Sequence, residues 1–108
     1  MAELSAKTCI PCEGGTEPLS EDQAQDYLQQ VHDDWHLEEG RLKREFAFRD
    51  FKSALAFTNS VGEIAEKEGH HPDIFLTYGQ VVIKLWTHAI GGLSENDFIL
   101  AAKIDAIA

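Results

Sequence analysis

The chain has 108 residues, with 19 acidic and 9 basic side chains and a formal net charge of -10. This length predicts a single domain with one modest core, and the charge opposes direct binding to nucleic acid or to an anionic membrane, where Lys and Arg must neutralise phosphates. No apolar run approaches the ~20 residues of a membrane span, and the start of the chain lacks the basic and apolar regions of a secretory signal, so we expect a cytoplasmic location.

Residues 1–19 are predicted to form an irregular arm, and residues 20–108 a single folded domain. The arm contains CIPCEGGTEPL, which is rich in Pro and Gly. Its cysteines, Cys9 and Cys12, are the two in the chain, too few for a structural zinc site of ~4 ligands. A redox pair is the alternative, but such a motif should open a helix after a strand. We therefore interpret the two thiols as a passive or loosely bridged pair in a mobile arm.

The first helix is predicted to begin after Ser20 and to end near Val31 or His32. Ser20 and Gln23 stand at the spacing of a capping box, in which each residue satisfies a backbone N–H of the other. A hairpin follows in WHLEEGRLKREFAF, where apolar residues alternate on both sides of a Glu-Gly turn.

The longest helix is predicted over residues 51–68, where apolar side chains recur at helical spacing. Asp50 is placed as its N-cap, and Gly69 stands where the left-handed residue after a helix commonly lies. A second hairpin is expected in DIFLTYGQVVIKLWTH, with its turn at Gly79-Gln80, and a last helix in SENDFILAAK.

The order of these elements, α-β-β-α-β-β-α, predicts an α+β fold. Three helices are expected to pack on one face of a four-stranded antiparallel sheet. A core of this size gains from self-association, so a homodimer or homotetramer is expected.

Three histidines are predicted to meet at the open end of the second hairpin. The expected two-residue turn places His71 opposite His88, and directly opposed side chains have Cβ atoms about 4.5–5.5 Å apart. His70 lies at the exit of the long helix, outside the strand pairing. Pro72 biases His71 toward an extended conformation and leaves His70 free to turn inward.

The same register divides the second hairpin into two faces. Ile74, Leu76 and Tyr78 are expected to face the core, whereas Phe75 and Trp86 share the face of the histidines. A flat heteroaromatic ligand could stack on these two rings. Packing beneath a partner subunit or a helix end is the other interpretation.

Three imidazoles in one place suit proton transfer, because their unperturbed pKa values lie near ~6.5. A lyase that expels water needs one group to protonate the departing hydroxyl and another to remove a proton from the adjacent atom. Glu66 precedes His70 by four residues, within reach as an anionic partner. A zinc site with His ligands is the rival hypothesis, although adjacent histidines fit it poorly. We expect His32 and His36 to be ordinary surface residues.

The sequence resembles the pterin-4a-carbinolamine dehydratase family over roughly residues 17–105. The matching pattern is Glu66-x3-His70-His71-Pro72-x5-Tyr78-x9-His88-x8-Asp97. The segments THAIGGLSENDF and FRDFKSALAFTNSVGEIAEKEGHHP are also similar to that family, and CIPCEGG resembles the leader of some bacterial and plastid members.

The resemblance implies dehydration of 4a-hydroxytetrahydrobiopterin (pterin-4a-carbinolamine) to quinonoid dihydropterin, which recycles the cofactor of aromatic amino acid hydroxylases. It implies neither a metal nor an organic cofactor. By the family's pattern His70, His71 and His88 are the catalytic trio, with His70 and His88 as the acid–base pair and His71 orienting the pterin. Glu66 would be a supporting carboxylate, and Asp97 belongs to the same motif but also stands where it can cap the last helix.

Two positions depart from the family's pattern. Gly69 stands where some relatives carry an acidic residue, and Trp86 stands where smaller polar residues are common. Members of the family also act as partner proteins in transcription or in enzyme assembly, so a non-catalytic dimerisation or assembly module is the alternative function. Small residues such as Ser60 and Gly62 in the long helix would allow close contact with another helix, although packing on the sheet explains them equally well.

Overall fold

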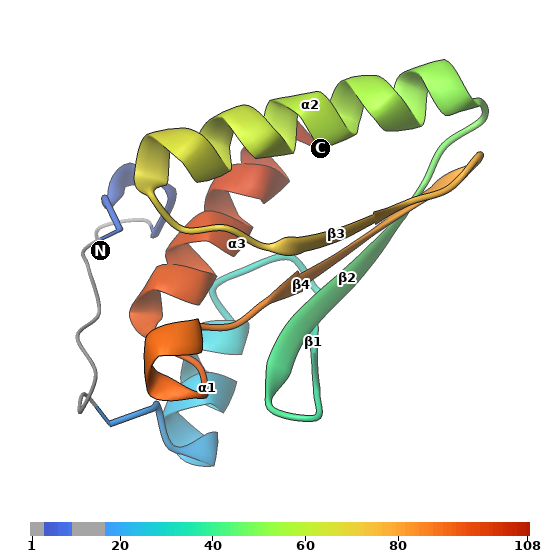
Figure 1. Ribbon diagram of the computed structural model, residues 1–108. Helices are drawn as coiled ribbons and strands as arrows, with labels where there is room; N and C mark the ends of the chain where they lie inside the picture. The colour runs from blue at the N-terminus through green and yellow to red at the C-terminus, as the bar shows by residue number, and fades with distance from the viewer. Residues whose placement is uncertain (1–3, 10–16) are drawn as a thin grey trace.

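The computed structural model describes residues 4–9 and 17–108, and in it three helices cover one face of a four-stranded antiparallel sheet (Figure 1). The elements are α1 (Glu21–Leu28), α2 (Phe51–Glu68), α3 (Glu95–Ile107), β1 (His36–Glu38), β2 (Arg41–Ala47), β3 (Asp73–Leu76) and β4 (Gln80–Leu85), with short 3-10 turns η1 (Leu4–Ala6) and η2 (His88–Ile90). The strand order is β1-β2-β4-β3, with every neighbouring pair antiparallel. The predicted fold class and element order are confirmed. Among the described residues, no helix has the length and apolar character needed to cross a membrane.

Local signals in the sequence set the start of α1 and both ends of α2, but α1 ends at Leu28 and not near Val31 or His32 as predicted. Ser20 Oγ accepts a hydrogen bond from the Gln23 amide at 3.2 Å, and Gln23 Oε1 accepts one from the Ser20 amide at 2.9 Å, which completes the predicted capping box. Asp50 accepts from the Ser53 amide at 2.7 Å, and that bond holds the pKa of Asp50 below its usual value. Gly69 ends α2 with a φ of 66°, a conformation that glycine adopts without strain.

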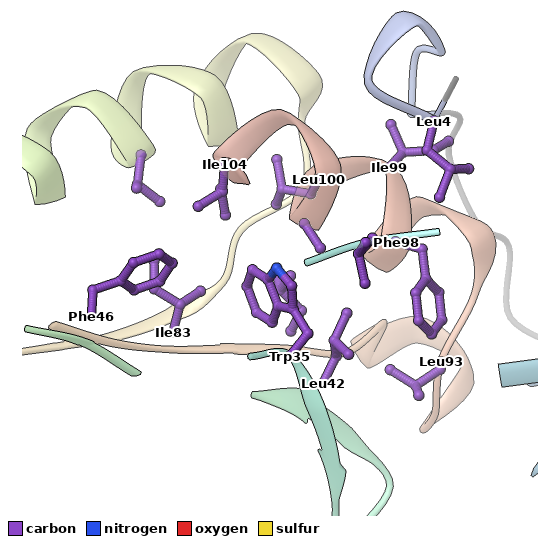
Figure 2. Close-up of a cluster of buried hydrophobic side chains, with 14 of the residues drawn as sticks. Leu4, Trp35, Leu42, Phe46, Ile83, Leu93, Phe98, Ile99, Leu100 and Ile104 are labelled. Carbon is purple, nitrogen blue, oxygen red and sulfur yellow. The ribbon is translucent and has the colours of Figure 1, made fainter. Parts of the chain in front are cut away.

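The core lies between the inner face of the sheet and the two longer helices (Figure 2). It contains Trp35, Leu42, Phe46, Ile83, Phe98, Leu100 and Ile104, all of them buried. Burying each large apolar side chain contributes about 1.5–3 kcal/mol. At one border of the core, Asp105 accepts from Trp35 Nε1 at 2.7 Å and from Arg44 Nη1 at 2.6 Å.

The register predicted for the second hairpin was wrong by two residues. Leu76 pairs with Val81 and Ile74 with Ile83, so the turn lies at Tyr78-Gly79 and not at Gly79-Gln80. The assignment of the two faces survives a shift of two residues, because side chains alternate with a period of two. Tyr78 itself is 71% exposed in the turn and does not face the core as expected.

A contact with another part of the chain explains this turn. The carbonyl oxygen of Gly79 accepts a hydrogen bond from the Phe48 amide at 2.8 Å. A Cβ atom at Gly79 would lie 3.1 Å from the Phe48 carbonyl oxygen, so this close approach favours glycine. Thr77 completes the turn, since both its amide and its hydroxyl donate to the carbonyl oxygen of Gln80.

The first described residues pack on the domain, contrary to the mobile arm that we expected. Leu4 is 4% exposed and lies in the core beside Ile99 of α3 (Figure 2). Lys7 forms a 2.9 Å ion pair with Glu95, and Lys103 donates to the Ser5 carbonyl oxygen at 2.9 Å. Cys12 lies outside the described residues, so the interpretation of the two cysteines as a pair stays a prediction, as does the domain boundary at residue 19.

Candidate active site

A pocket of about 690 Å³ lies where the C-terminal end of α2, the start of β3 and the segment after β4 meet. The three predicted histidines, His70, His71 and His88, all line it, and so does Trp86. The sequence therefore brings together residues from both sides of the second hairpin, although His71 and His88 are not the cross-strand pair that we expected. That part of the prediction was wrong because the register differs and because β4 ends at Leu85, before His88.

His70 is turned into the protein by the end of α2. The left-handed Gly69 reverses the chain, and the His70 amide donates back to the Ala65 carbonyl oxygen at 3.2 Å. The imidazole is only 13% exposed, and its Nε2 lies 2.6 Å from Oδ1 of Asp97, a residue that is fully buried. A buried carboxylate so placed fixes the orientation of the imidazole ring.

Asp97 has two functions, because each of its oxygens has its own partners. Oδ1 contacts His70, while Oδ2 accepts from the Ser94 amide at 2.9 Å and from the Thr87 hydroxyl at 2.9 Å. The bond to Ser94 caps α3, so the predicted capping role is observed together with the contact to His70. A carboxylate can only accept, so His70 Nε2 carries the proton of this bond and Nδ1 is left to accept a proton when the ring is neutral.

Glu66 pairs with His71 and not with His70, the partner that we expected. Its Oε2 contacts His71 Nε2, and both side chains are exposed, at 78% and 61%. The assignment was wrong because His70 turns inward to Asp97, and His71, extended before Pro72, turns back along the last turn of α2. The two adjacent histidines thus have one carboxylate each, one buried and one in solvent.

His88 lies in η2, where it stacks on the indole of Trp86. The two ring centroids are 4.0 Å apart and the planes differ by 25°. The indole N–H of Trp86 donates to Asp73 Oδ2 at 3.4 Å, and the guanidinium of Arg41 lies 4.5 Å from the Trp86 ring. His88 itself is exposed toward solvent and the pocket.

Phe75 does not belong to the pocket lining. It is 54% exposed on the outer face of the sheet, with Lys84 Nζ 5.6 Å from its ring centroid. Within the ranges 4–9 and 17–108, no group of three or more His, Cys, Asp or Glu side chains is arranged to hold a metal ion. The three histidines therefore share a pocket without converging on one point.

Sequence reasoning missed the wall of the pocket that the N-terminal segment supplies. Glu68 has a side chain only 6% exposed; its Oε1 accepts from the Cys9 amide at 2.9 Å and its Oε2 lies 3.7 Å from Lys103 Nζ. Cys9 lines the same pocket and its thiol donates to the Asn96 carbonyl oxygen at 3.6 Å. No local sequence pattern predicts these contacts, because they join segments from three parts of the chain.

The Cys9 thiol is expected to react slowly. Burial, with the nearby Glu68 carboxylate, raises its pKa to about 12. A raised thiol pKa leaves less thiolate at any given pH, and the thiolate is the reactive form. In a Cys12→Ser variant, which leaves Cys9 as the one thiol, alkylation by iodoacetamide at pH 8 should be at least about ten-fold slower in the folded protein than in urea. Equal rates in the two conditions would show that this thiol is neither buried nor raised in pKa.

Comparison with known protein families agrees with this geometry. Residues 17–107 match the family model described as pterin 4 alpha carbinolamine dehydratase. A protein of Alkaliphilus metalliredigens is 53% identical over 106 residues, covering 97% of this chain and 96% of the relative. One from Halorhodospira halophila is 51% identical, covering 96% of each. Both carry the provisional name pterin-4-alpha-carbinolamine dehydratase.

Two solved structures share the fold. The transcriptional coactivator/pterin dehydratase from Brucella melitensis has a TM-score of 0.80 and 34% identity, covering 85% of this chain and 99% of that one. A pterin dehydratase-like protein identified as a RuBisCO assembly factor in the alpha-carboxysome has a TM-score of 0.56 and 28% identity, covering 68% of this chain and 86% of that one. On the match of sequence, fold and motif, this chain belongs to the pterin-4a-carbinolamine dehydratase family.

Proposed function

We propose that this protein is a hydro-lyase that dehydrates 4a-hydroxytetrahydrobiopterin, or a closely related 4a-hydroxytetrahydropterin, to the quinonoid dihydropterin. The observation that carries the proposal is one pocket lined by three histidines, of which His70 is backed by the buried carboxylate of Asp97. Family membership supports the choice of substrate class. The pocket of about 690 Å³ lies within the range of small-molecule sites, which is about 300–1,000 Å³.

The reaction needs one proton delivered and one removed. The C4a–O bond breaks as the hydroxyl takes a proton and leaves as water, the N5–H bond breaks, and a C4a=N5 double bond forms. The two protons move at adjacent atoms of the pterin, so two titratable side chains in one pocket can carry out both transfers, one giving a proton to the hydroxyl and the other taking the N5 proton. Positioned acid–base groups typically contribute about 10²–10⁴-fold to such steps.

In this proposal His70 and His88 are the acid–base pair. Asp97 holds the His70 ring through Nε2, which leaves Nδ1 to accept the N5 proton. His88, the exposed ring, delivers the proton to the departing hydroxyl. His71, paired with Glu66, binds and orients the pterin. No metal or organic cofactor takes part.

A stopped-flow experiment tests the activity. The substrate 4a-hydroxytetrahydropterin is generated in the instrument and its loss is followed by absorbance, with and without micromolar protein. The wild-type chain should accelerate the loss at least about ten-fold over the spontaneous rate, because acid–base catalysis alone supplies more than that. A folded protein that leaves the spontaneous rate unchanged would contradict the proposal.

A non-catalytic assembly module is the second candidate. It is favoured by the two solved structures that share the fold, one described as a transcriptional coactivator/pterin dehydratase and the other as a RuBisCO assembly factor. Phe51 and Leu55 of α2 are 43% and 40% exposed, one turn apart on the helix, where a partner could pack. Such a module would keep its cellular role when His70 or His88 is replaced and lose it when Phe51 and Leu55 are changed to polar residues.

We propose a cytoplasmic homodimer or homotetramer that works in the same pathway as an aromatic amino acid hydroxylase, whose spent cofactor it returns. The net charge of -10 makes direct contact with nucleic acid unfavourable.

A further inference from the structure

The indole of Trp86 forms the partition between two cavities. One is the pocket of the histidines; the other, of about 440 Å³, lies between the start of α1, the β1–β2 turn and the segment after η2. Trp86 lines both cavities, whereas His88 lines only the first and Arg41 only the second. A residue in the second cavity can therefore reach the histidine pocket through this one side chain.

Both faces of the indole are occupied. The His88 ring stacks with its centroid 4.0 Å from that of Trp86, and the Arg41 guanidinium carbon lies 4.5 Å from the ring centroid of Trp86. Two groups this close to one ring centre cannot share a face, and the two border different cavities, so Arg41 and His88 lie on opposite faces. The indole N–H is held at its edge by Asp73, 3.4 Å away. A flat ligand consequently finds no free face of Trp86 to stack on.

The position of Arg41 follows from the sheet. Leu42 of β2 pairs with Leu85 of β4, and continuing that antiparallel register by one residue sets Arg41 opposite Trp86. Opposed side chains on neighbouring strands lie within reach of each other. Arg41 also pairs with Glu38 of β1, so its backbone is held in the sheet on that side. The strand pairing of β2 thus places the Arg41 guanidinium beside Trp86.

The stack on Trp86 is what orients His88, whereas the other two histidines are oriented by carboxylates. His70 is oriented by Asp97 and His71 by Glu66. For the His88 side chain, the described part of the chain offers no hydrogen bond or ion pair, and the contact that orients its ring is Trp86. An exposed imidazole with one stacking contact turns freely once that contact is loosened.

We propose that Arg41 is a positioning residue for the dehydration, acting through Trp86 to hold the His88 imidazole toward the pocket. The guanidinium packs on the far face of the indole by a cation–π contact and fixes its plane, and the plane of the indole fixes that of His88. The catalytic consequence rests on the proposed function; the structural part does not. Arg41 lines the second cavity, and the contact that joins it to the wall of the histidine pocket is the one with the Trp86 ring.

The structural part is tested by NMR without any substrate. The ring protons of His88, identified by their loss in His88→Gln, should be shifted upfield in the wild type by the ring current of Trp86. Arg41→Gln should reduce that upfield shift by at least half, and Arg41→Lys, which keeps the cation, should retain most of it. Arg41→Met, which keeps the aliphatic packing without the charge, provides a second variant should Arg41→Gln fail to fold. An unchanged His88 shift in both neutral variants would overturn the proposal.

The catalytic part is tested by the dehydratase assay on the same variants. Arg41→Gln should lower kcat about five-fold with KM within about two-fold, because an ill-positioned proton donor slows the chemical step more than it weakens binding. Arg49→Gln is the matched control, since that arginine is 90% exposed, and it should leave kcat unchanged. A displaced His88 resonance with an unchanged kcat would overturn the positioning role. If the wild type has no activity, the proposed function fails and the NMR result still decides whether Arg41 holds the stack.

Discussion

Replacing His88 with alanine is expected to lower kcat for 4a-hydroxytetrahydropterin dehydration by about 10²–10⁴-fold, the range that a positioned acid or base contributes. The chain should remain folded, because His88 is exposed and is held by its stack on Trp86 alone within the described structure. Stopped-flow rates on the purified variant, with circular dichroism and thermal unfolding in parallel, separate a catalytic defect from a folding defect.

A matched histidine provides the control for this prediction. His36 is exposed on β1 and lines neither cavity beside Trp86, so His36→Ala should change kcat by less than about two-fold. If His88→Ala kept more than a tenth of the wild-type kcat, or if His36→Ala lost as much, His88 would not be a member of the acid–base pair.

Replacing Asp97 with alanine is expected to lower the free energy of unfolding by at least about 3 kcal/mol, since three donors lose their acceptor and each buried donor left unsatisfied costs roughly 1–3 kcal/mol. The fully buried carboxylate of Asp97 serves three such donors, the amide of Ser94, the hydroxyl of Thr87 and the ring of His70. Urea unfolding near pH 7 measures the loss. Asp33→Ala, at an exposed position, is the control and should stay within about 0.5 kcal/mol of the wild type.

Asp97→Asn separates the two functions of this residue. The amide oxygen can still cap α3, so the loss of stability should be smaller than that of the alanine variant. The asparagine amide no longer fixes the proton of His70 on Nε2, so kcat should fall at least about ten-fold, as expected when the carboxylate that sets the tautomer of a catalytic histidine is removed. A stability loss below about 1 kcal/mol for Asp97→Ala would mean that the buried hydrogen bonds of this carboxylate are replaced by others.

The sequence alone determined the elements and the composition of the site. Ser20, Asp50 and Gly69 act within a few residues of themselves, and capping and left-handed termination depend only on local backbone geometry. Apolar periodicity likewise defines α2 and the two hairpins, because it reports which face of each element must be buried. The motif around His70, His71 and His88 indicates the family and three residues of the pocket lining, whereas the wall that contains Cys9 and Glu68 is not indicated by any local pattern.

The tertiary structure alone decided how those residues are paired. The turn of the second hairpin lies one residue earlier than predicted, and its strand pairing differs by two residues, because the Gly79 carbonyl oxygen is hydrogen-bonded to the Phe48 amide, a contact that no local pattern reveals. The contacts of Asp97 with His70 and of Cys9 with Glu68 were missed for the same reason, because each joins segments far apart in the chain. Glu66 contacts His71 instead of His70 because His70 is already turned toward Asp97. Local physical chemistry sets backbone conformation and burial, whereas hydrogen-bond partners depend on which distant groups packing brings within about 3 Å.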